Sequence, residues 1–316
     1  MMFKNAVIYS FTKEFPSNER ALDELEDRLH DHPFKPVGPQ EVSRSGWVGV
    51  LPGTDDRVFN TNDCLFIRLR TDTKVLKSSA INREVEELAA VIQREQSRKV
   101  RKAEKHELRE QVRQKYLPNA QIDSAYTVGY IDLKKQWLIV EAPSFKAAED
   151  FASHLRKTLG SLPVRPLALE LGPGFVMTGT LDPNTGAYLT RFFTLGEECT
   201  MAGLDGEKAS FKDIDLTSEE VIDHITESGM TVSSLRLSRE DQVAFTLTED
   251  FRVKKIKFLD QFQEDVLNYE PEDEDIDAGL SYAQATLFLM TGEFRQVFDD
   301  LIKCMGGVQE DFEVDL

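Results

Sequence analysis

Nine basic residues lie close together between Arg94 and Lys115, where only four acidic residues oppose them. The segment carries a net charge of +5, although the whole chain has 38 basic and 56 acidic residues and a net charge of −18. Guanidinium and ammonium groups gathered on an acidic protein are typical of a surface for a polyanion, above all for nucleic-acid phosphates. The candidate residues are Arg94, Arg98, Lys99, Arg101, Lys102, Lys105, Arg109, Arg113 and Lys115.

The hydrophobic pattern predicts that one long helix, over residues 79–116, positions these side chains. Ile81, Val85, Leu88 and Ile92 recur at helical steps, and the proline at 118 ends the helix, because it pushes the preceding residue out of the helical region. At about 100° per residue, most of the basic residues fall within an arc of about 120°. They would form a one-sided stripe about 30 Å long.

A helix face that pairs its own charges is the alternative interpretation, and Glu95–Lys99 is a correctly spaced pair. However, successive pairs four residues apart in the stripe, beginning with Arg94–Arg98, are like-charged, and each costs about 0.2–0.5 kcal/mol. This spacing favours a polyanion surface. Since no recognition helix, zinc motif or RNA-recognition motif accompanies it, binding would tolerate many sequences.

A second basic segment, residues 252–258, reads as a strand. Lys254, Lys255 and Lys257 are therefore additional candidates for phosphate contact. In a strand, Lys255 and Lys257 point to one side and Lys254 points to the other. An edge strand protected by lysines explains the same residues equally well.

Patterns for catalysis or for a cofactor are not evident. No Ser, Cys or Asp stands in a nucleophile motif, and the five histidines lack metal-ligand spacing. Residues 273–277 resemble the start of a calcium loop, but Ala278 and Gln284 stand where glycine and glutamate are required. We therefore expect no enzyme, no cofactor and no metal. A divalent-metal nuclease built from paired carboxylates is a further alternative, which predicts strand cleavage on adding magnesium.

Length and composition predict a chain of two or three subdomains. The chain of 316 residues exceeds one typical core, and 41% apolar residues suffice to bury more than one. It has no apolar run long enough to span a membrane and no signal-peptide pattern at its start. Three cysteines, far apart, indicate free thiols in a reducing cytoplasm.

Periodicity and capping residues predict the other elements. Strands are expected at residues 3–11, 64–70, 126–132, 136–142, 243–248, 252–258 and 285–290. Helices are expected after Ser17, from Ser144 to Gly160, after a capping box at 217–220, and from Gly292 to Gly306. Irregular or loop-rich connections are expected at residues 46–48 and 171–215.

Nine short segments, spread over nearly the full length, together resemble the RdgC family of bacterial recombination-associated proteins. They are Phe3-Lys4-Asn5, Gly46-Trp47, and residues 97–105, 117–118, 131–132, 155–163, 215–220, 254–258 and 288–293. The resemblance implies a mixed α+β chain, a horseshoe-shaped or elongated monomer that forms a ring-shaped homodimer, with DNA passing through a positively charged hole. It further implies binding of double-stranded and single-stranded DNA without marked sequence preference, antagonism of RecA, a cytoplasmic, nucleoid-associated location and no enzymatic activity.

The elements and the resemblance together suggest three domains and a dimer gate. We expect a central α/β domain over residues 1–75 and 123–170, a helical tip over 76–122, and an α+β base over 171–316. By position, the resemblance puts gate contacts at Gln121, Ile122 and Lys212. The resemblance implies an aromatic residue at the position of Gln121, which Ile122 follows here, and a more basic pair at the position of Asp213-Ile214, which Lys212 precedes here.

An acidic protein-interaction scaffold without DNA binding is the alternative function. The basic helix would then dock on an acidic partner or on residues 260–277, which hold nine acidic residues and no basic one.

Overall fold

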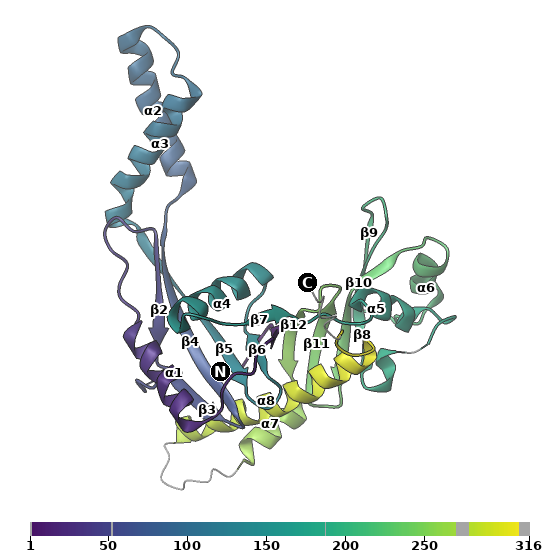
Figure 1. Cartoon of the computed structure of the whole chain (residues 1–316). Coiled ribbons are helices and arrows are strands. Elements are labelled where there is room, and N and C mark those ends of the chain that lie inside the picture. Colours follow the sequence, from purple (N-terminus) through teal and green to yellow (C-terminus); the bar gives the residue numbers. More distant parts are fainter. Residues whose placement is uncertain (1, 52, 187, 270–277, 310–316) are drawn as a thin grey trace, which may run out of the picture.

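A tall arm and a two-sheet body give the chain the outline of a U (Figure 1). The computed structural model describes residues 2–51, 53–186, 188–269 and 278–309. Both sheets are antiparallel, and the arm rises from the first of them, opposite a shorter upright that carries β9 and α6. The prediction of a mixed α+β chain is confirmed.

The first sheet has the strand order β2-β4-β5-β6-β1-β7, and β3 also pairs with β4. Alternation along β4 sends Leu65 and Ile67 to one face and Phe66 to the other, so both faces are apolar and both are covered. The strands are β1 Val7–Phe11, β2 Ser43–Val48, β3 Val58–Thr61, β4 Cys64–Val75, β5 Gln121–Asp132, β6 Trp137–Val140 and β7 Val164–Pro166.

Helices α1 (Glu19–Asp31) and α4 (Phe145–Leu159) supply the apolar residues that cover one face of this sheet. The predicted caps of α4 are confirmed: Ser144 accepts a hydrogen bond from the N–H of Ala147, and Gly160 ends the helix at φ 78°. Helix α1 begins one residue later than expected, because Asn18 rather than Ser17 caps it.

The prediction that residues 46–48 are irregular is wrong, because they belong to β2. Trp47 is fully buried in this strand, and its Nε1–H donates to Thr158 Oγ1 at 2.8 Å. A Cβ on Gly46 would meet the backbone of Phe34 at 2.3 Å. The glycine thus marks a close approach of two backbones rather than a turn.

The second sheet has the order β12-β11-β10-β8-β9. The expected hairpin of β11 and β12 is confirmed, but the prediction of a loop-rich region at 171–215 is wrong. Helix α5 (Pro173–Leu181) has two glycines and no strong helix periodicity, yet it packs on β10. The strands are β8 Thr194–Ala202, β9 Lys208–Lys212, β10 Thr231–Arg239, β11 Val243–Thr248 and β12 Val253–Phe258.

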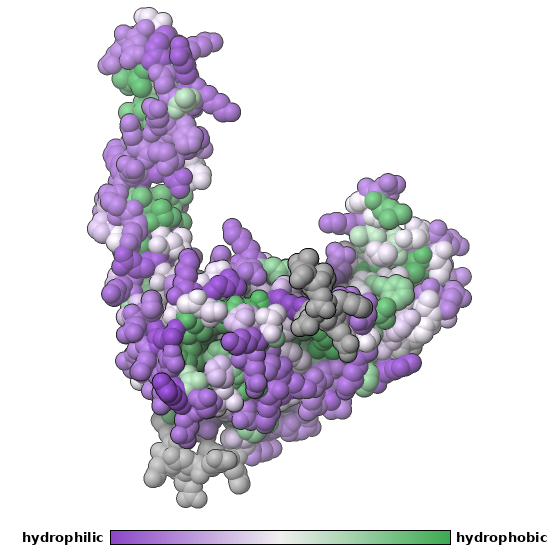
Figure 2. Space-filling view, viewed as in Figure 1, coloured by the Kyte–Doolittle hydropathy of each residue, from purple (hydrophilic) through white to green (hydrophobic). Residues whose placement is uncertain are grey.

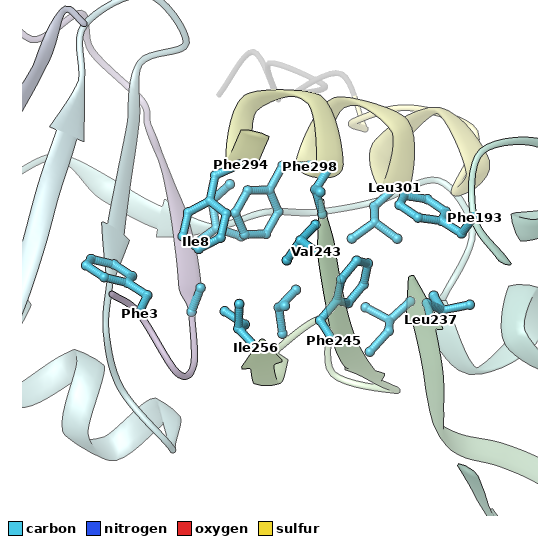
Figure 3. Packing of buried hydrophobic residues seen from close by; sticks show 14 of the residues in the cluster. Phe3, Ile8, Phe193, Leu237, Val243, Phe245, Ile256, Phe294, Phe298 and Leu301 are labelled. Carbon is cyan, nitrogen blue, oxygen red and sulfur yellow. The ribbon is translucent and has the colours of Figure 1, made fainter. Parts of the chain in front are cut away.

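One long helix, α8 (Ala278–Cys304), packs across the body. The predicted strand at 285–290 is therefore wrong, because a short apolar run fits a buried helix as well as a strand. Figure 3 shows Phe294, Phe298 and Leu301 of α8 above residues of both sheets, with Ile8 on one side and Val243 and Phe245 on the other. One continuous apolar core therefore joins the two sheets.

A buried ion pair adds to this joint. Arg295 of α8 donates to the fully buried Asp132 at the end of β5, with Nε–Oδ2 at 2.6 Å, and also donates to the carbonyl oxygen of Asn62. The N-terminal segment contributes too, because Ala6 and Val253 exchange backbone hydrogen bonds between the sheets. The three-domain division stays a prediction.

Two short helices complete the body. Helix α6 (Glu219–Thr226) buries Val221 and Ile225 as expected. The predicted capping box is wrong, because the N-cap is Ser218 rather than Thr217, and Ser218 makes no side-chain cap bond. Helix α7 (Asp260–Leu267) takes up the first part of the acidic segment. Residues 270–277, with the calcium-loop resemblance at 273–277, lie outside the described residues.

The expected free thiols are confirmed, since Cys64, Cys199 and Cys304 are buried and unbridged. Within the described ranges, no helix is long and apolar enough to cross a membrane.

Candidate nucleic-acid interface

The basic segment forms a helical hairpin at the end of the arm, so the prediction of one long helix is wrong (Figure 1). Helix α2 (Ser78–Gln96) ends at Ser97, which adopts the left-handed conformation at φ 48°. Helix α3 (Lys102–Tyr116) begins after Arg101, whose backbone N–H donates to Glu104 Oε2 at 2.7 Å. The expected end before Pro118 is confirmed, where a single 3-10 turn, η1 (Leu117–Asn119), follows.

A small apolar core explains why the chain folds back. Ile81 and Val85 of α2 pack on Val112 of α3, with Leu76 and Leu108 beside them. A single straight helix would have left these side chains in water on a narrow arm. The predicted apolar face is therefore confirmed for Ile81 and Val85, and its partner is the second half of the same segment.

The one-sided stripe is wrong for the same reason, because the basic residues belong to two antiparallel helices and a turn. Several of them pair with acids that the single-helix geometry placed far away. Lys105 Nζ lies 2.8 Å from Glu86, and Lys115 Nζ lies 2.7 Å from Glu84, both across the hairpin. The spacing of like charges within one helix disfavoured pairing inside the segment, and this argument is wrong for Lys105 and Lys115.

The turn and α3 hold further paired cations. Arg98 Nη2 lies 2.6 Å from Glu104, and Arg113 Nη1 lies 3.3 Å from Glu110. Arg109 donates a hydrogen bond to Asn82 Oδ1 at 3.2 Å. The guanidinium of Arg98, followed by the Arg101 backbone N–H, lowers the pKa of the Glu104 carboxyl to about 2.

Four exposed cations at the turn make no ion pair with any described residue: Arg94, Lys99, Arg101 and Lys102. We call these four residues the turn cluster. They span the last turn of α2, the connection and the first residue of α3, at the far end of the arm. Because they are solvated and have no acidic partner among the described residues, these four residues can meet phosphates without first losing a carboxylate, and they lie together at the end of the arm.

The second basic segment lies elsewhere, on β12 of the body. Lys255 and Lys257, predicted to point to the same side of the strand, are both exposed, whereas Lys254 is partly buried. Lys255 has φ 49° at an irregularity of the strand pairing, and its Nζ lies 2.8 Å from Glu198. The strand is not a free edge, because the N–H of Ile256 donates to the carbonyl of Lys4.

The three expected gate residues lie on different parts of the U. Gln121 and Ile122 open β5 where the helical hairpin meets the strands, and both are exposed. Lys212 ends β9 on the opposite upright and is also exposed. The fold of one chain does not bring them together.

The sequence prediction missed exposed apolar side chains on the arm. Figure 2 shows hydrophobic patches that interrupt its hydrophilic surface. Leu88, expected in the helix core, is 37% exposed because Ala89 takes the buried position. Which apolar side chains of α2 and α3 are buried and which are exposed depends on how the two helices pack, and the sequence pattern does not show this. The others on the arm are Val75, Val91, Tyr116, Ile122 and Tyr126.

Among the residues that the structure describes, no three or more His, Cys, Asp or Glu side chains are grouped so that they could hold a metal ion.

Comparisons with known proteins cover nearly the whole chain. A family model described as "Putative exonuclease, RdgC" matches residues 1–308. A recombination-associated protein RdgC from Psychromonas ingrahamii is 33% identical over 313 residues, which are 98% of this chain and 99% of the relative. A protein with the same name from Mannheimia succiniciproducens is 32% identical, over 96% of this chain and 97% of the relative. Another from Yersinia pestis is 33% identical, over 97% of this chain and 98% of the relative. The chain therefore belongs to the RdgC family.

Proposed function

We propose that this protein binds DNA without sequence preference and acts in recombination, with the turn cluster as a phosphate-binding surface. The observation that carries the proposal is the set of four unpaired cations, Arg94, Lys99, Arg101 and Lys102, at the end of a protruding arm of an acidic chain. Flexible lysine and arginine side chains contact phosphates of any sequence. The names of the relatives support the setting in recombination.

The U-shaped chain supports a ring of two copies as the form that acts on DNA. Gln121 and Ile122 lie on one upright and Lys212 on the other, so a second copy placed mouth to mouth could join them pairwise. The exposed apolar side chains of the arm, Val75 and Ile122 among them, suit such a contact. A closed ring slows dissociation from duplex DNA even where each phosphate contact is weak.

Restraint of RecA would follow from occupancy alone, because a coated or encircled duplex, or a covered single strand, is withheld from another DNA-binding protein. The acidic remainder of the chain repels phosphates, which keeps DNA at the basic surface. Lys254, Lys255 and Lys257 of β12 are secondary contacts in this proposal. We place the protein in the cytoplasm, at the nucleoid.

The proposed role is non-enzymatic, although the matching family model mentions an exonuclease. A single titration separates these possibilities: the full chain is added to a fluorescently labelled linear duplex at low salt, with and without magnesium. Binding with intact strands supports the proposal. Strand shortening that requires magnesium would instead identify a nuclease.

The pairing within the hairpin favours the scaffold alternative, because Lys105 and Lys115 already have acidic partners. In that case the basic residues of the hairpin form ion pairs with carboxylates of a partner protein, as Lys105 and Lys115 do with Glu86 and Glu84. Absence of duplex binding at low salt, in a protein that is folded by circular dichroism, would favour the scaffold and contradict DNA binding.

A further inference from the structure

Planar side chains alternate along one face of the first sheet, below the helical hairpin. The Arg70 Cζ lies 4.2 Å from the ring centroid of Phe34 and 5.8 Å from that of Tyr126, and the Arg68 Cζ lies 4.2 Å from the Tyr126 centroid. Arg68 and Arg70 share this face because they are two residues apart on β4, and Tyr126 of β5 stands directly opposite Arg70. Rows of aromatic rings and guanidinium planes are surfaces on which nucleobases stack.

The two arginines of this row differ in their partners. Arg70 is fixed by Asp72, with hydrogen bonds of 2.8 and 3.0 Å to the two carboxylate oxygens. Arg68 has no ion pair with a described residue, and its enclosed Nε has no hydrogen-bond partner there. The row therefore ends on the Arg68 guanidinium, which within the described part of the chain has no acidic partner and whose Nε–H makes no hydrogen bond there. A buried donor of this kind costs free energy unless a ligand supplies an acceptor.

A cavity of about 880 Å³ opens beside this end of the row. Arg68 of β4, Val128 of β5 and Glu141, the residue after β6, stand in one line. Arg68 pairs with Val128, and the Glu141 N–H donates to the Val128 carbonyl. The small Val128 is the floor, and the side chains on either side of it start roughly 10 Å apart, which is two strand spacings. Leu51 and Leu280 are among the apolar residues that line the cavity.

The far wall of the cavity holds a carboxyl group that can accept hydrogen bonds. Glu141 Oε1 accepts one from the backbone N–H of Lys4 at 3.2 Å, and no cation of the described residues pairs with it. Its environment is partly apolar, and burial raises the pKa of this carboxyl. The site thus combines a flat cationic wall, an apolar floor and one acceptor on the opposite side.

We infer that this cavity takes an unpaired nucleobase of a single DNA strand, stacked on the Arg68–Tyr126 end of the row, with base N–H groups donating to Glu141. The inference rests on the proposed DNA binding and adds a second site, distinct from the turn cluster. A base within a duplex is stacked and paired, so it cannot enter without being extruded. The cavity therefore selects single strands, while the turn cluster serves phosphates of either form.

The test compares the full-length wild type with Arg68→Ala, Tyr126→Ala and Glu141→Gln, using fluorescence anisotropy. The probes are a single-stranded oligodeoxycytidine, an abasic strand of the same length, and a duplex. We expect each of the first two variants to weaken binding to oligodeoxycytidine about tenfold, because one base stack is lost. Glu141→Gln should weaken it less, because it keeps one acceptor oxygen. Affinity for the duplex and for the abasic strand should stay within about twofold of wild type.

Controls keep the outcomes distinct. Circular dichroism and thermal melting verify that each variant is folded, and the turn-cluster variant Lys99→Ala should weaken all three probes alike. If the wild type binds none of the probes, the proposed function fails and the cavity assignment fails with it. If the wild type binds but Arg68→Ala and Tyr126→Ala bind oligodeoxycytidine as tightly as wild type, the cavity assignment alone is overturned.

Discussion

At the residue scale, the opposite helix decides which cations of the hairpin are available to a ligand. Glu84 and Glu86 of α2 hold Lys115 and Lys105 of α3, whereas the turn cluster lies beyond the reach of those carboxylates. An exposed ion pair of this kind contributes little to stability. Its main effect is on binding, since a phosphate must displace the carboxylate before it can contact the lysine.

Replacing these carboxylates should therefore strengthen DNA binding. We expect the double variant Glu84→Gln/Glu86→Gln to bind duplex more tightly at low salt, and the slope of log K against log salt to steepen by about 0.9 for each lysine that gains a phosphate. The measurement is a salt titration by anisotropy. Glu87→Gln/Glu107→Gln, on the same hairpin but without ion pairs among the described residues, makes the same change in net charge and is the control. Equal slopes in all three proteins would show that Lys105 and Lys115 do not reach DNA.

Glu104 gives a pH dependence whose sign follows from its environment. Its pKa is lowered from 4.5 to about 2 by Arg98 and by the backbone N–H of Arg101. A lowered folded-state pKa stabilises the turn above about 4.5, and this contribution is lost as the pH falls toward about 2. An NMR titration of the Arg101 amide should show its midpoint near the lower value, and no such midpoint in Glu104→Gln. A midpoint near 4.5 would mean that the carboxyl is unpaired in solution.

At the element scale, the hairpin is a small folding unit of its own. The apolar core between α2 and α3 consists of Ile81, Val85 and Val112, with two partly buried leucines beside them. Elements with so few buried apolar contacts open more readily than the body of the protein.

Truncation of this small core should unfold the hairpin locally. We expect Ile81→Ala to lower the local stability of α2 and α3 by about 2–5 kcal/mol, because the side chain is 6% exposed and its truncation removes buried apolar contacts from the small core. Native-state hydrogen exchange of the helix amides measures this change. Val91→Ala, at a position that is 47% exposed, should change it little. A uniform loss of protection throughout the body would contradict an independent hairpin.

The elements that the sequence predicted best are those whose signals are local. Ser144 and Gly160 bound α4, and alternating residues mark the β11–β12 hairpin, since caps and periodicity depend on near neighbours. Long-range packing decided the others. The break at Ser97 depends on Val112 meeting Val85, and α5 exists because β10 covers it. The basic candidates were found by composition, but which of them are unpaired required the hairpin register.

At the scale of the whole molecule, the body fixes the distance between the α2–α3 arm and the upright that carries β9. Helix α8 packs on both sheets, and Arg295 binds the buried Asp132 at the end of β5, one of the two long strands that continue into the arm. A rigid base of this kind keeps the arm and the β9 upright at a fixed separation. A second copy would then meet two preformed ends, which is what ring closure requires.

The measurement that tests DNA binding by the turn cluster most directly is the salt dependence of duplex affinity in a triple variant. Lys99→Ala/Arg101→Ala/Lys102→Ala should flatten the slope of log K against log salt by roughly 2.7, about 0.9 for each lost phosphate contact. The control Arg44→Ala/Lys134→Ala/Lys303→Ala removes three cations that already pair with acids of the body, and so changes the net charge equally. We predict a slope close to wild type in the control. Equal flattening in both triple variants, or no flattening in the first, would contradict the assignment of the turn cluster as the DNA-binding surface.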